Sequence, residues 1–180
     1  MNTPLLPDLI ETMAGHGFRV ADASGIADVK LLLKRQTWNT NRAIVAVTLD
    51  PLPSDMRGYL RELRRRVAFR CGFVPFFWGI GIQAIIIAPG IVESGIDPAQ
   101  HVARVDNQWA IIQSVFLVDS IFRSCRSART WGQFVTGKFQ DAIALVLSRH
   151  FPPDAATGGI LISEERLQQL LNEARSPQQN

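Results

Sequence analysis

The chain has 180 residues, of which 47% are hydrophobic and 19% are charged, and its formal net charge is +3. This length suits one domain with its own core, and the composition excludes a disordered chain, which would be more charged and less apolar. Cys71 and Cys125 lie far apart in the sequence, which excludes a disulfide framework and a zinc site built on cysteine alone, so we expect two buried thiols.

The first fifty residues predict a helix followed by strands. Apolar side chains recur at helical spacing over residues 5–16, and glycines come directly after that segment. Two short runs, at residues 18–25 and 28–38, are separated by a turn that contains glycine and predict a hairpin near a sheet edge. Residues 42–50 are almost entirely apolar and rich in valine, as in a strand covered on both faces.

The segment 54–71 predicts the clearest helix, which Ser54 or Asp55 would cap. Five residues step by four, three, four and four positions and form one apolar stripe: Met56, Leu60, Leu63, Val67 and Cys71. Residues 51–70 hold six basic and two acidic side chains, a net charge of +4, so the whole excess of positive charge lies in this window. A uniformly basic nucleic-acid binder is therefore excluded, and a protein with one basic helix is indicated.

Residues 71–92 carry no charge, which raises the alternative of a membrane span behind a basic collar. The run is interrupted by Pro75 and Pro89 and contains four glycines and a glutamine. The part from 79 to 90 is rich in isoleucine and bounded by glycine and proline, which is typical of a central strand. We therefore expect an internal strand here and no membrane span.

The second half of the chain is less regular. Residues 108–119 are nearly all apolar, and their periodicity fits either a central strand or a buried helix. Asp119 ends that run, either as a cap for the next segment or as a buried acid with a raised pKa. Residues 123–130 predict a basic polar connection, and residues 131–151 a long helix.

These elements predict an α/β fold with a mixed sheet of four or five strands, flanked by helices. The expected order is αβββαβ, followed by a further strand or helix and by C-terminal helices. Residues 1–151 would form the α/β domain and 152–160 a linker. The segment 161–176 would dock as a C-terminal helix.

The arginines of the basic helix are the candidate binding residues, and we name Arg57, Arg61, Arg64 and Arg65 as a possible track for phosphates. The alternative is a solvated helix face on which like charges at a spacing of four repel one another slightly. Tyr59 and Phe69 are the nearby aromatics that could add stacking to such a track.

The order of elements over residues 5–90 resembles the core of the restriction-endonuclease-like fold, the PD-(D/E)xK nucleases. In that family a carboxylate on the second strand and a D/E-x-K triplet on the third strand bind a divalent metal. The resemblance implies that Asp28, which opens DVKLLLKR, stands for the first acid. The third strand, AIVAVTL, holds neither acid nor lysine, and Asp50 lies just past it. The resemblance therefore implies the fold with its catalytic motif lost, and no metal beyond the candidate Asp28.

Taken together, the sequence predicts a non-catalytic interaction or accessory protein without a cofactor. We expect a protein partner or a homo-oligomer, and a cytoplasmic location, because residues 1–17 hold no basic region or long apolar run. The alternative is a nucleic-acid-binding or nuclease-like protein that uses the basic helix 54–71. A third interpretation is a membrane-associated protein that uses residues 71–92.

Overall fold

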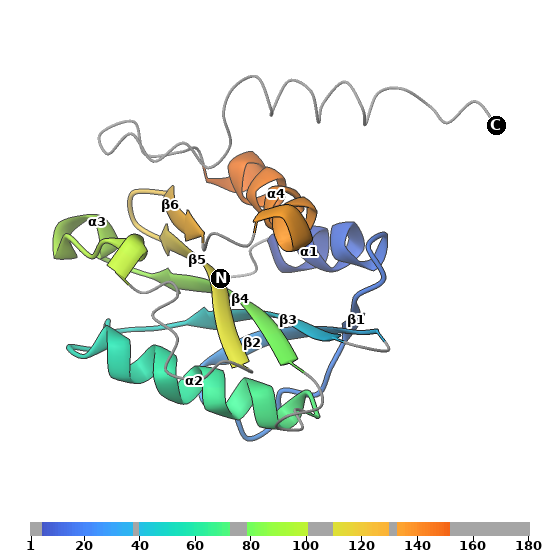
Figure 1. Ribbon diagram of the computed structural model, residues 1–180. Coiled ribbons are helices and arrows are strands. Elements are labelled where there is room, and N and C mark those ends of the chain that lie inside the picture. Colours follow the sequence, from blue (N-terminus) through green and yellow to red (C-terminus); the bar gives the residue numbers. More distant parts are fainter. Residues whose placement is uncertain (1–4, 38–39, 73–78, 101–109, 130–132, 152–180) are drawn as a thin grey trace.

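The computed structural model describes residues 5–37, 40–72, 79–100, 110–129 and 133–151. They form a six-stranded mixed sheet whose strands lie in chain order, with helices on both faces (Figure 1). The strands are β1 (Arg19–Val20), β2 (Val29–Gln36), β3 (Thr40–Thr48), β4 (Gly79–Ala88), β5 (Ala110–Asp119) and β6 (Ser124–Arg129). The helices are α1 (Leu5–Ala14), α2 (Met56–Arg70), α3 (Ile91–Ser94) and α4 (Gln133–His150), with a 3₁₀ turn η1 (Pro98–Gln100).

The connections between the strands explain their directions. β1, β2 and β3 pair as antiparallel neighbours, and antiparallel strands need no helical crossover between them. β3, β4 and β5 run parallel, and α2 supplies the crossover from β3 to β4 that a parallel pair requires. β6 returns antiparallel to β5. The predicted α/β class and the order αβββαβ are thereby confirmed.

The centre of the sheet is buried on both faces. α2 covers one face, and α1 and α4 cover the other (Figure 1). Ile85 belongs to the core beneath α1 and α4, and its neighbour Ile86 belongs to the core beneath α2. Strands covered in this way favour apolar residues on both faces, which accounts for the apolar sequences of residues 43–47 in β3 and of most of β4.

Of the uncharged run at 71–92, the structure describes residues 71–72 and 79–92. β4 occupies Gly79–Ala88 in the middle of the sheet, as predicted, while residues 73–78 lie outside the described part of the chain. Among the described helices, none combines the length and apolar character that a membrane crossing requires.

Three details differ from the prediction or complete it. The sheet has six strands instead of four or five. The segment left open between strand and helix is the strand β5. The basic connection predicted at 123–130 is wrong, because Ser124–Arg129 forms β6, whose backbone pairs with β5 although its sequence is polar. The expected linker and C-terminal helix, at 152–160 and 161–176, lie outside the described residues.

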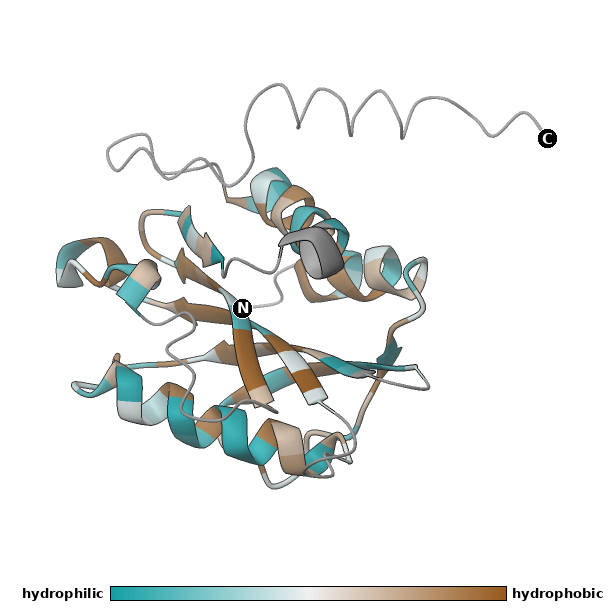
Figure 2. Cartoon of the chain, viewed as in Figure 1, coloured by the Kyte–Doolittle hydropathy of each residue, from teal (hydrophilic) through white to brown (hydrophobic). Residues whose placement is uncertain are grey.

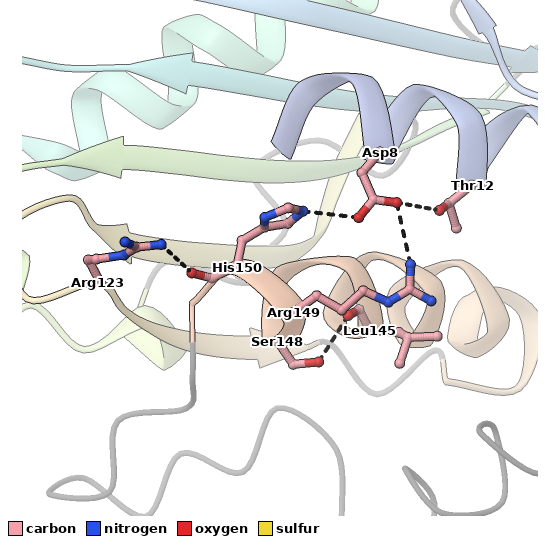
Figure 3. Close-up of polar contacts among 7 residues, drawn as sticks. All are labelled: Asp8, Thr12, Arg123, Leu145, Ser148, Arg149 and His150. Carbon is pink, nitrogen blue, oxygen red and sulfur yellow. Dashed lines mark hydrogen bonds and ion pairs between the residues drawn. The ribbon is translucent and has the colours of Figure 1, made fainter. Parts of the chain in front are cut away.

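Helices α1 and α4 are joined by polar contacts as well as by the core (Figure 3). The Asp8 carboxylate lies 3.0 Å from Nε2 of His150 and 3.4 Å from Nη1 of Arg149. Nη2 of Arg123 donates to the backbone carbonyl of His150 at 3.4 Å. These contacts hold the C-terminal end of α4 against α1 and against the turn that precedes β6.

Asp119 closes β5 as a cap. Its carboxylate is buried and accepts hydrogen bonds from the backbone N–H groups of Val92, Ile121 and Phe122, at 2.8–2.9 Å. Burial by itself raises the pKa of Asp119, but the backbone donors outweigh it and the pKa lies below its usual value. The alternative of a buried acid with a raised pKa is therefore wrong.

Candidate functional site

Helix α2 places its apolar stripe on the sheet and turns its arginines outward. Asp55 caps the helix and accepts a hydrogen bond from the backbone N–H of Gly58 at 2.8 Å. Met56, Leu60, Leu63 and Val67 are buried, as the spacing predicts. The remaining positions give the outer face of α2 its hydrophilic character (Figure 2).

A groove of about 800 Å³ runs along α2 and is partly lined by the loop that connects β1 to β2. Its charged lining consists of five arginines and one glutamate: Arg61, Glu62, Arg64, Arg65, Arg66 and Arg70. Phe69 also lines the groove, and its side chain is 86% exposed. The groove therefore combines a strong excess of positive charge with one large apolar side chain in solvent.

Acidic side chains hold three of these arginines in place. Glu62 accepts hydrogen bonds from Arg65 at 2.8 and 2.9 Å and from Arg66 at 2.7 Å. The hydrogen bonds from Arg65 and then Arg66 lower the pKa of Glu62 to about 2. Arg70 reaches across to the loop after β1, where it pairs with the Asp22 carboxylate and donates to Oγ of Ser24 at 2.7 Å.

Three of the four arginines chosen from the sequence, Arg61, Arg64 and Arg65, lie in the groove lining. Arg57 is exposed on the same helix and lies outside that lining. Arg66 and Arg70 also line the groove and were missed as site residues, although both belong to the same basic window. In the sequence, Phe69 is identified only as an aromatic residue near the arginines. Because Phe69 lies outside the apolar stripe of the helix, its position predicts that its side chain faces solvent.

The acid suggested by the nuclease resemblance is not part of a carboxylate cluster. Asp28 is exposed just before β2, with φ of 66°, and its backbone carbonyl accepts a hydrogen bond from the N–H of Thr48 at 3.0 Å. Asp50 is also exposed, two residues past the end of β3. Within the described ranges, no three histidine, cysteine, aspartate or glutamate side chains gather to hold a metal ion.

The two cysteines are buried thiols, as expected. Burial raises the pKa of Cys71 to about 11 and also raises the pKa of Cys125. Neither thiol is thereby activated as a nucleophile at neutral pH. Neither cysteine lines the groove along α2.

No protein-family model, no curated protein and no solved structure matches this chain.

Proposed function

We propose that this protein is a non-catalytic interaction protein that binds a polyanion in the groove along α2. The observation that carries the proposal is the composition of the groove, whose lining contains five arginines and one glutamate. Arginine is well suited to such a surface, because its planar fork donates two parallel hydrogen bonds to a carboxylate or a phosphate. An acidic surface of a partner protein fits this chemistry, and arginine and phenylalanine are both enriched at protein interfaces.

A nucleic acid is the second candidate, and Phe69 favours it. Every base has a flat π face that can stack on an exposed aromatic ring, and arginines around the ring can contact the phosphates. The order αβββαβ resembles that of the restriction-endonuclease-like fold, and this resemblance supports the same interpretation of a nuclease-like protein that has lost its metal site. In both cases the groove binds its ligand without cleaving it.

Replacing Arg61, Arg64 and Arg65 together with glutamine tests the groove. On a labelled DNA duplex, each lost phosphate contact should weaken binding by roughly tenfold at 0.1 M salt, because fewer counterions are released. The slope of log K against log salt should fall by about 0.9 per contact, and so by up to about 3 for the triple variant. Fluorescence anisotropy at several salt concentrations measures both quantities.

The matched controls are single variants on α2. Arg64→Gln removes a charge inside the groove and Arg57→Gln removes one outside it, and neither arginine forms an ion pair with another described residue. Arg64→Gln should lower the salt slope, whereas Arg57→Gln should not. The same titration with a labelled polyglutamate peptide separates the two partners: binding of the peptide alone selects an acidic protein. The proposal fails if the wild type binds neither probe or if the triple variant binds both unchanged.

Phe69→Ala distinguishes stacking from charge. If unpaired bases stack on Phe69, this variant should bind a labelled single-stranded oligonucleotide about tenfold more weakly, since one stacked base contributes about 1–3 kcal/mol. Binding to a duplex, whose bases are already stacked on each other, should change by less than about twofold. Equal losses on both probes would show that Phe69 acts as a general apolar contact. Phe69 is 86% exposed, so the replacement leaves the core intact.

A further inference from the structure

A second group of cations lies on the opposite face of the sheet from α2, around the buried ring of Phe139 on α4. Cζ of Arg35 and Cζ of Arg42 lie 5.1 and 4.8 Å from the ring centroid, and Nζ of Lys138 lies 5.2 Å from it. The ring of His16 meets the same ring edge-on, at 5.8 Å between centroids. Segments far apart in the sequence thus bring four basic side chains to one aromatic ring. We call Arg35, Arg42, Lys138 and His16 the Phe139 cluster.

The charges of the Phe139 cluster repel one another. Arg35 and Arg42 are directly opposed in the antiparallel pair of β2 and β3, where like charges are destabilising. Burial, followed by the charge of Arg35, lowers the pKa of Arg42. Burial, followed by the charges of Lys138 and Arg35, lowers the pKa of His16. The face of the Phe139 ring attracts these cations and offsets part of this repulsion. Within the described part of the chain, neither Arg35 nor Lys138 forms an ion pair with a carboxylate.

Polar side chains of β4, β5 and α4 lie next to the cluster. Arg42 pairs in register with Gly81 on β4, and the carboxamide of Gln113 occupies the space above Gly81, with its Nε2 2.7 Å from where a Cβ would lie. Gln113 also accepts a hydrogen bond from Nε2 of Gln83 at 3.1 Å. Three fully buried side chains nearby have a polar atom without a partner in the described structure: Oε1 of Gln83, Oγ of Ser114 and Oε1 of Gln140. Most buried polar atoms in folded proteins have a partner, so we expect bound water beside these atoms.

We infer that the Phe139 cluster is a binding site for a phosphate group, carried by a small phosphorylated molecule. An oxyanion between Arg35, Arg42 and Lys138 would replace their repulsion with charge-assisted hydrogen bonds. A phosphate dianion matches several cations better than a single carboxylate does. The site lies across the sheet from the α2 groove, so it does not depend on the function proposed for that groove.

Isothermal titration of the full chain with inorganic pyrophosphate, at constant ionic strength set by chloride, tests the site. The wild type should bind in a saturable manner, and Arg35→Gln should raise Kd by about tenfold, the effect of one lost charge-assisted contact. Lys138→Gln, at an exposed position that tolerates replacement, should raise Kd by several-fold and keeps the test valid if Arg35→Gln does not fold. A bound anion should also raise the pKa of His16, which NMR titration measures with and without the ligand.

The control is a variant outside both the cluster and the lining of the α2 groove. Arg57→Gln, at an exposed position, should bind pyrophosphate as tightly as the wild type. A labelled duplex identifies the source of the phosphate: if Lys138→Gln also weakens duplex binding, the group belongs to a nucleic-acid backbone, and otherwise to a small molecule. The inference is overturned if the wild type shows no saturable heat, or if Arg35→Gln and Lys138→Gln both bind pyrophosphate as the wild type does.

Discussion

Ile85→Ala and Ile86→Ala are each expected to lower the free energy of unfolding by about 3 kcal/mol. The two residues are adjacent on β4 and point to opposite faces of the sheet, and both have 0% exposure. Each replacement would leave a cavity in a different core, one beneath α1 and α4 and the other beneath α2. Losses of similar size at consecutive positions are the signature of a strand that is covered on both faces.

Urea denaturation followed by circular dichroism measures these losses. Ile121→Ala is the matched control, because Ile121 is 66% exposed and its replacement should change stability by less than about 0.5 kcal/mol. A small effect at Ile85 or Ile86, comparable with that of Ile121, would mean that one face of β4 is open. That outcome would contradict the position of this uncharged run in the centre of the sheet.

Asp119→Ala is expected to lower the free energy of unfolding by about 3 kcal/mol, because it removes the acceptor of three part-buried backbone donors at once. The carboxylate oxygens accept from Val92 on one side and from Ile121 and Phe122 on the other, so they tie the start of α3 to the end of β5. Asp119→Asn keeps one acceptor oxygen and loses the charge, and should cost about half as much. Urea denaturation at pH 7 gives both values.

The contribution of Asp119 should also depend on pH. Its pKa is lower in the folded protein than the value of about 3.9 in an unfolded chain, so the unfolded state takes up a proton first as pH falls. The stabilisation is therefore fully present well above pH 4 and is lost as pH falls through the folded pKa. The stability difference between wild type and Asp119→Asn should shrink from pH 7 to pH 3. A difference that stays constant over this range would contradict the lowered pKa; Asp97→Asn, at an exposed position, is the control.

The sequence by itself determined the elements whose pattern is local. The apolar stripe of α2 repeats at helical spacing, and its buried residues are those that the spacing selects. The continuous apolar runs of β3 and β4 predicted strands covered on both faces, and the order αβββαβ came from these elements. Arg61, Arg64 and Arg65 were found in the same way, because residues outside the stripe of a surface helix must face solvent.

The tertiary structure decided everything that depends on partners far apart in the chain. β6 has the polar sequence SCRSAR and forms a strand because β5 supplies its hydrogen bonds, which no local pattern encodes. The choice of strand over helix for Ala110–Asp119 comes from its register with β4. Arg70 pairs with Asp22, which lies 48 positions away in the sequence. The Phe139 cluster gathers side chains from β2, β3, α4 and the segment after α1, and its mutual repulsion exists only because the fold brings like charges together.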